Sequence, residues 1–131
     1  MILGEVKVLV VEDVEAMRVQ IKSLLRTFGL PKVTLCDSFR KAAVALDEAE
    51  FNLILCDWHL EGVNNGMDLL HHVRSVDKLK PIGFIMVTAE GTREMVIEAV
   101  KAGVDDYLLK PLTTAQIQDK VYGVLLRKKV L

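Results

Sequence analysis

Short apolar runs alternate with longer segments of helical period along the whole chain. The runs expected as strands are residues 6–11, 33–36, 53–56, 82–87 and 106–109. Helical periodicity follows each of them, over 14–28, 38–49, a stretch around Met67 to Val73, a stretch around Met95 to Val100, and a last segment from 114. This alternation predicts five βα units, with helices on both faces of a parallel five-stranded sheet.

Right-handed crossovers leave few topologies for such a doubly wound α/β sheet, and the flavodoxin-like strand order 2-1-3-4-5 is the expected one. Ser38 is the predicted N-cap of the second helix, and Gly29 and Gly103 are predicted to follow helix ends. In the fourth helix, Met95, Val96, Ala99 and Val100 are expected to point inward.

Composition narrows the class of protein. The 131 residues are 51% hydrophobic, which fits a single compact domain over 1–131. A net charge of −1 argues against direct nucleic-acid binding, and the Arg127–Lys129 cluster is better explained as a helix C-terminus. The sequence predicts neither a membrane span nor a signal peptide, so a cytoplasmic protein is expected.

Cys36 and Cys56 lack metal-ligand spacing and are predicted to be buried thiols. The three histidines lack metal-ligand spacing too.

Polar residues end four of the predicted strands. Glu12-Asp13, Asp57, Thr88 and Lys110 each follow an apolar run directly, so they should meet at the carboxyl rim of the sheet. Three converging carboxylates repel one another and must bind either protons or a cation, and oxygen ligands with open positions suit Mg²⁺. Lys110 can pair with a carboxylate or with phosphoryl oxygens, and Thr88 offers a hydroxyl donor. Asp57 is the best candidate for a nucleophile that forms an acyl phosphate.

These residues, in this order and at these strand ends, resemble the receiver domain of two-component response regulators, and the stand-alone chemotaxis-type receivers in particular. The resemblance covers essentially the whole chain. It implies that Asp57 accepts a phosphoryl group, with Lys110 and Thr88 assisting. It also implies that Mg²⁺ is bound by Asp13, Asp57 and the backbone carbonyl of His59, and by Glu12 through water. A cis peptide bond at Lys110-Pro111 belongs to the same pattern.

The resemblance further implies a signalling protein rather than an enzyme, with only self-catalysed phosphoryl transfer and autodephosphorylation. Thr88 and Tyr107 match the switch pair, while His59 and Glu90 flank the path of the attacking water. The implied phosphodonor is a sensor histidine kinase or a phosphotransfer protein, and the implied target is a protein such as a flagellar motor component or a phosphatase. The implied output surface is formed by the fourth helix, fifth strand and fifth helix, with Glu90, Arg93, Lys101, Tyr107 and Gln116.

The loop after Asp57 departs from the family pattern. Receivers usually have Pro four residues after the acceptor and Gly eight after it, whereas this chain has Glu61 at the first place and Gly66 one residue late. We therefore expect an altered loop, with an insertion at Asn64-Asn65, that changes partner contacts or the lifetime of the phosphoryl group.

Other interpretations stay open from the residues. Glu12-Asp13 could be acidic residues favoured by a helix N-terminus, Asp57 an N-cap, and Tyr107 an ordinary strand aromatic. A flavodoxin-type cofactor binder shares the fold, but acid in the first loop would repel a phosphate. A phosphohydrolase would normally carry a second Asp where His59 stands. The chain could also be the receiver of a larger DNA-binding or enzymatic regulator, or an inactive docking receiver.

Overall fold

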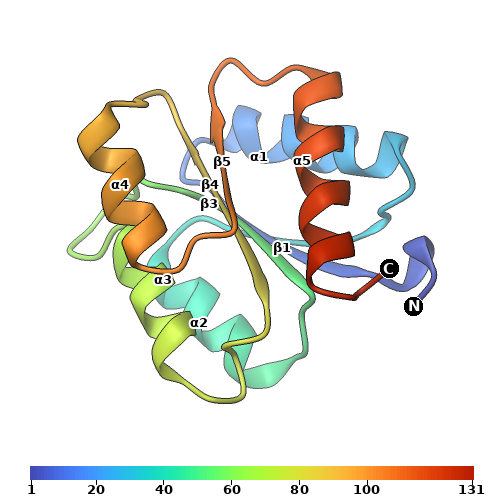
Figure 1. The fold of residues 1–131 in the computed structure, drawn as a ribbon, viewed down its shortest axis with the longest axis horizontal. Helices are drawn as coiled ribbons and strands as arrows, with labels where there is room; N and C mark the ends of the chain where they lie inside the picture. The colour runs from blue at the N-terminus through green and yellow to red at the C-terminus, as the bar shows by residue number, and fades with distance from the viewer.

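The computed structural model describes residues 1–131 and contains one parallel five-stranded sheet between two helical layers (Figure 1). The strand order is β2-β1-β3-β4-β5, which confirms the predicted fold class and topology. The strands are β1 (Lys7–Val11), β2 (Lys32–Cys36), β3 (Leu53–Asp57), β4 (Gly83–Thr88) and β5 (Asp106–Leu109). The helices are α1 (Glu15–Thr27), α2 (Phe39–Glu48), α3 (Gly66–Ser75), α4 (Arg93–Lys101) and α5 (Thr114–Arg127), preceded by a short 3-10 helix at Leu3–Glu5.

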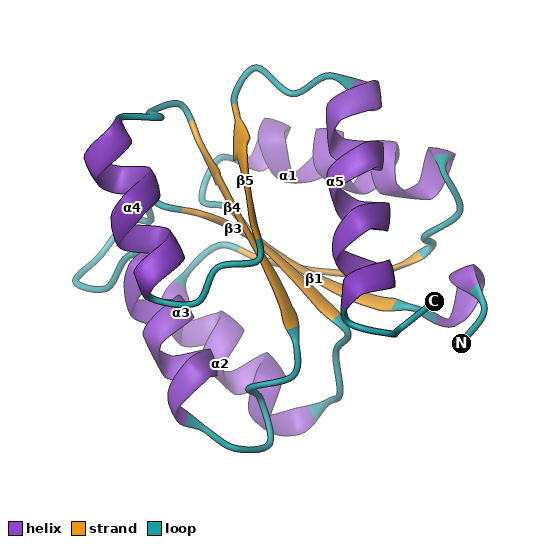
Figure 2. Cartoon of the chain, viewed as in Figure 1, coloured by secondary structure: helices purple, strands orange, loops and turns teal.

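Alternation along the strands divides the interior into two cores. Residues such as Leu9, Ile54 and Phe84 pack with α2, α3 and α4, whereas Val8, Leu55 and Ile85 pack with α1 and α5. Figure 2 shows these helices on the two sides of the twisted sheet. Strands β3 and β4 are buried along their whole length, because helices cover both of their faces.

Helix boundaries follow the local chemistry that the sequence predicts. Ser38 caps α2 by accepting a hydrogen bond from Lys41 N at 3.2 Å. Gly29 and Gly103 lie just beyond helices α1 and α4 with φ angles of 96°, a left-handed conformation that suits glycine. Lys110-Pro111 is cis, as the family resemblance implies.

One predicted helix face is wrong. Val100 is 61% exposed, although the sequence pattern predicts that it points inward, and only Ala99 of α4 is fully buried. The inward stripe of this helix runs through Met95, Ala99 and Ala102 at spacings of four and three, so Val100 lies about 100° away from its centre. The exposed side of α4 is therefore more apolar than the sequence pattern indicates.

Arg127–Lys129 lies at the end of α5, as predicted. Two of these basic residues also bind the turn before β5: an Arg127 guanidinium nitrogen donates to the Asp105 carbonyl oxygen at 3.0 Å, and Lys128 Nζ lies 3.2 Å from Asp105 Oδ1. Both cysteines are buried free thiols, which confirms their predicted place in the core. None of the helices combines the length and apolar character needed to cross a membrane.

Candidate functional site

Strand register brings the polar strand ends together at one edge of the sheet. Val11 pairs with Cys56, so Glu12 and Asp57 follow side by side on adjacent strands. Val87 lies between Asp57 and Leu108 in the ladder, and Lys110 is two residues beyond Leu108. Because side chains alternate along a strand, Glu12, Asp57 and Lys110 share the face that carries α1 and α5.

Lys110 joins the two carboxylates of this face. Its Nζ lies 2.5 Å from Glu12 Oε1 and 2.6 Å from Asp57 Oδ2. The side chains are nearly enclosed, with exposed fractions of 1% for Glu12, 8% for Asp57 and 17% for Lys110. The pairing confirms that Lys110 can hold a carboxylate, and burial makes each of these charges costly to leave alone.

Burial shifts the pKa values of this cluster. The pKa of Glu12 is raised from 4.5 to about 7, mainly because desolvation disfavours its charged form, and Asp13 and Asp57 add to the effect while Lys110 opposes it. Burial alone would lower the pKa of Lys110, but its bonds to Asp57 and Glu12 outweigh that effect and raise it. The ammonium therefore stays charged near neutral pH, whereas Glu12 titrates there.

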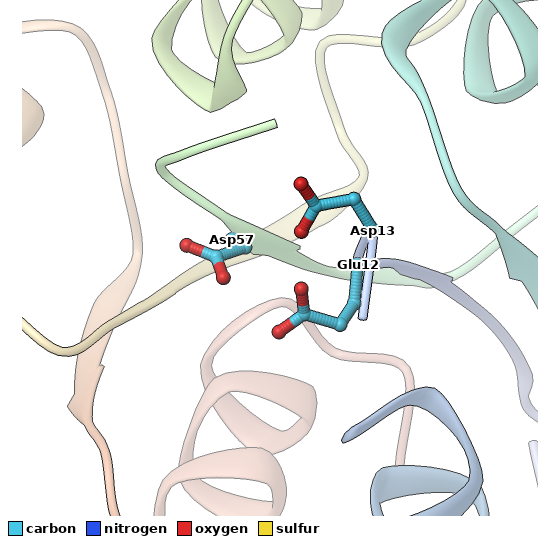
Figure 3. A group of neighbouring side chains, drawn as sticks. All are labelled: Glu12, Asp13 and Asp57. Carbon is cyan, nitrogen blue, oxygen red and sulfur yellow. The ribbon is translucent and has the colours of Figure 1, made fainter. Parts of the chain in front are cut away.

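Asp13 completes an acidic cluster at the end of β1. Single carboxylate oxygens of Glu12, Asp13 and Asp57 all lie within 4.8 Å of one another. Figure 3 shows Glu12 and Asp13 reaching from the end of β1 toward the end of β3, where Asp57 lies. Oxygen donors at this spacing fit a hard divalent cation such as Mg²⁺, which accepts a few carboxylates and keeps water at its other positions.

Thr88 and Tyr107 lie toward the α4 side of the sheet. Met86 pairs with Tyr107, and Met86 and Tyr107 both belong to the core beneath α2, α3 and α4. Thr88 is fully buried, and its Oγ1 accepts a hydrogen bond from Glu90 N at 3.3 Å. The Tyr107 hydroxyl donates to the Glu90 carbonyl oxygen at 2.9 Å, so the backbone of Glu90 connects the two residues.

His59 and Glu90 meet at the exposed edge of the site. His59 Nε2 lies 2.7 Å from Glu90 Oε1, and more than half of each side chain is exposed. The backbone N–H of His59 also donates to Asp57 Oδ1 at 3.0 Å. The pair therefore links the residues that follow β3 and β4 beside Asp57.

Trp58 follows Asp57 directly in the sequence, and its side chain is buried. Its ring lies 6.5 Å from the Tyr107 ring, in an edge-to-face arrangement. The indole is thus placed to sense changes at both Asp57 and Tyr107.

Two residues that support the site were not predicted. A guanidinium nitrogen of Arg18, on α1, donates to the Glu12 carbonyl oxygen at 2.8 Å and fixes the backbone where β1 ends. Gly66, the first residue of α3, packs directly on the peptide that joins Asp57 to Trp58. A Cβ atom there would overlap the Asp57 carbonyl oxygen and lie 2.9 Å from Trp58 Cα.

The altered loop after β3 keeps Gly66 in this position. Gly66 N donates to the Trp58 carbonyl oxygen at 2.8 Å, and Asn65 and Asp68 form a reciprocal capping box at the start of α3. Val63 is 99% exposed, and Gly62 has a φ of 101°. Gly62 and Val63 therefore belong to the exposed part of the loop, whereas its last residues are fixed by the α3 cap and by the bond to Trp58.

The simpler interpretations explain only part of this geometry. Glu12 Oε2 accepts from Val14 N at 3.2 Å, so it does contact the start of α1, but its other oxygen binds Lys110. Asp57 caps no helix, because residues 58–65 separate β3 from α3, and α3 is capped by Asn65. Tyr107 makes a specific hydrogen bond rather than only filling space.

Comparison with known proteins gives consistent matches. The family model described as "Response regulator receiver domain" matches residues 8–122. Chemotaxis protein CheY-3 of Vibrio cholerae serotype O1 is 37% identical over 115 residues, covering 88% of each chain. Chemotaxis protein CheY of Pseudomonas aeruginosa is 37% identical over 121 residues, covering 92% of this chain and 97% of that protein.

A solved structure agrees with the fold. The receiver domain of the sensor histidine kinase PA1611 from Pseudomonas aeruginosa PAO1 has a TM-score of 0.81 at 26% identity, over 91% of this chain and 96% of that one. That structure is described with a magnesium ion coordinated in the active site cleft.

Proposed function

The chain belongs to the response regulator receiver domain family, and on that premise we propose that it is a Mg²⁺-dependent phosphoacceptor in two-component signalling. Receiver domains are signalling proteins. The observation that carries the proposal is the group of Glu12, Asp13 and Asp57 at the sheet rim, with Lys110 bonded to two of the three carboxylates.

In this proposal Asp57 is the nucleophile. Its Oδ2 is held by Lys110 at 2.6 Å and its Oδ1 by His59 N at 3.0 Å, so the carboxylate is fixed in one orientation. Lys110 stays protonated and can offset charge that develops on a transferring phosphoryl group. Asp13, Asp57 and the His59 carbonyl would hold Mg²⁺ directly, and Glu12 would hold it through water. The ion would supply positive charge to the phosphoryl oxygens.

The same geometry supports Thr88 and Tyr107 as the switch. The Thr88 hydroxyl and the Tyr107 hydroxyl both contact the backbone of Glu90. A Thr88 hydroxyl that turns toward a phosphoryl group on Asp57 would give up its bond to Glu90 N, and this change would reach Tyr107 through the Glu90 carbonyl. The proposed output surface is then α4, β5 and α5, and the proposed modulators of phosphoryl lifetime are His59 and Glu90.

The proposed partners are a sensor histidine kinase or phosphotransfer protein as phosphodonor, and a protein target. A chemotaxis-type output, with a target such as a flagellar motor component or a phosphatase, is supported by the match to chemotaxis CheY proteins over nearly their full length. Family membership favours this function over a flavin carrier or a phosphohydrolase.

Trp58 fluorescence tests the proposal directly. We expect a saturable change on adding Mg²⁺ and a second change on adding acetyl phosphate or beryllium fluoride, because the buried indole lies beside both Asp57 and Tyr107. Asp57→Asn should lose the second change and should gain no phosphoryl mass by intact mass spectrometry. A phosphoryl adduct of equal yield in the Asn variant would rule out Asp57 as the acceptor.

A further inference from the structure

The end of the sheet opposite the carboxylate rim carries two shallow hollows on either side of Phe51. One, of about 320 Å³, lies between residues 49–52, residues 78–82 and the chain near Val130. The other, of about 340 Å³, lies between residues 31–34, Lys7 and residues 49–51. Because Ala49, Glu50 and Phe51 line both hollows, the two form one path across this end of the molecule. We call this path the basal groove.

The floor of the basal groove is apolar and held in place by the backbone. Phe51, Leu79 and Ile82 supply its apolar surface. Asn52 joins two strands beneath it: Asn52 Oδ1 accepts from Lys7 N at 2.8 Å, and Asn52 N donates to the Lys7 carbonyl oxygen at 2.9 Å. The Asn52 carbonyl oxygen accepts from Gly83 N at 3.1 Å. A surface fixed in this way needs little reorganisation to bind a partner.

The edges of the basal groove are strongly positive. Their charged residues are four lysines and one acid, namely Lys7, Lys32, Lys78, Lys128 and Glu50. Lys128 is bound to Asp105, whereas the side chains of the other three lysines are exposed and make no ion pair. Lys7 and Lys32 begin strands, so they do not compensate a helix C-terminus. This excess of positive charge contrasts with the net charge of −1 for the whole chain.

We propose that the basal groove binds an extended acidic segment of another protein, with one large apolar side chain seated beside Phe51 and carboxylates facing Lys7, Lys32 and Lys78. The lysines at the edges of the groove favour a negatively charged ligand. The apolar floor favours a segment that carries one apolar anchor residue over a simple polyanion. A flat bilayer surface would not reach Phe51, because Phe51 lies between two hollows and is partly buried. The groove lies at the far end of the sheet from Asp57, so this binding goes beyond the phosphoacceptor function.

The probe for this test is a fluorescein-labelled peptide of sequence EEDFEELEE, measured by fluorescence anisotropy at low salt with the full chain. We expect saturable binding that weakens about tenfold or more in the double variant Lys32→Glu/Lys78→Glu. The matched control is Lys22→Glu/Arg40→Glu, which makes the same change in net charge on α1 and α2 and should bind the peptide nearly as the parent does. Asp57→Asn should also bind normally, which separates this proposal from the phosphoacceptor function.

Amide chemical shifts locate the peptide. Perturbations that gather at residues 31–34, 49–52 and 78–82, and that are lost when the peptide phenylalanine is replaced by serine, support the basal groove. The proposal is wrong if no binding saturates up to millimolar peptide, if the control variant weakens binding equally, or if the serine peptide binds as well. The protein could instead dimerise in a concentration-dependent way that Lys32→Glu/Lys78→Glu abolishes. That result would identify the groove as a contact between two copies of the chain and would also overturn the proposal.

Discussion

The affinity of the carboxylate cluster for Mg²⁺ is expected to rise steeply as pH increases across neutrality. The pKa of Glu12 is raised from 4.5 to about 7, so near neutral pH many molecules of the metal-free protein carry a proton on this carboxyl. A cation held by this cluster requires the charged form, and binding must therefore expel the proton. The ionised fraction of a group with this pKa rises about tenfold from about pH 6 to about pH 8, and the apparent affinity should follow it.

Stability should change in the opposite sense. Because the folded-state pKa of this acid lies above its unfolded value, the folded protein binds the extra proton between about 4.5 and about 7. The free energy of unfolding of the metal-free protein should therefore fall as pH rises through this window, by roughly 3 kcal/mol from Glu12. Added Mg²⁺ should restore much of this loss at the upper end of the window.

Two measurements check this reasoning. Mg²⁺ titrations followed by Trp58 fluorescence give the apparent affinity at each pH, and calorimetry in buffers of different ionisation enthalpy counts the protons released. We expect nearly one proton per ion at about pH 6 and close to none at about pH 8. Glu12→Gln should remove the pH dependence, whereas Glu94→Gln, on the exposed side of α4, should retain it. A Glu12→Gln variant with the parent slope would show that the proton resides on another group.

Two further predictions concern residues that hold the site. Gly66→Ala should weaken Mg²⁺ binding and slow phosphorylation by acetyl phosphate, with a stability loss of about 1–3 kcal/mol, because the new methyl would push the peptide that follows Asp57. In α5, a Cβ atom added at Gly123 would meet no atom within 4 Å, so Gly123→Ala should instead stabilise the folded protein by about 0.5–1 kcal/mol. Equal losses of stability in the two variants would contradict this reasoning. Lys110→Met should destabilise the metal-free protein by about 3–5 kcal/mol at alkaline pH, and by less near pH 5 where Glu12 is protonated. Urea unfolding at both pH values measures the difference, and a loss independent of pH would mean that Glu12 is not the group left uncompensated.

The parts of the fold that follow from periodicity could be predicted from the sequence. The five strands, their order and the meeting of Glu12 with Asp57 all depend on short apolar runs, parallel pairing and a polar residue at each strand end. Lys110 could be assigned to the same group because it ends the last strand in the same way. These features repeat along the chain and need no knowledge of distances.

Features that depend on contacts between elements could not be predicted in this way. The bond from Arg18 to the Glu12 carbonyl requires the distance between α1 and the end of β1. The close packing of Gly66 on Asp57 depends on how the longer loop is folded, and the sequence indicated only that this glycine comes one residue late. The exposure of Val100 depends on which stripe of α4 faces the sheet. Because apolar residues lie on both sides of that stripe, periodicity alone could not identify the buried side.

Because side chains alternate along the strands, Glu12 and Asp57 lie on the opposite face of the sheet from Tyr107. Glu12, Asp57 and Lys110 face the side of the sheet covered by α1 and α5, while Tyr107 faces the side covered by α4. The two sides are connected at the rim by the backbone of Glu90, which binds Thr88 Oγ1 through its N–H and the Tyr107 hydroxyl through its carbonyl. In the proposed function, a change at Asp57 would reach α4 most directly through this short loop, because β4 and β5 are held in register by their ladder. Substitutions on the Tyr107 side should therefore alter the output while leaving Mg²⁺ binding at Asp57 nearly unchanged.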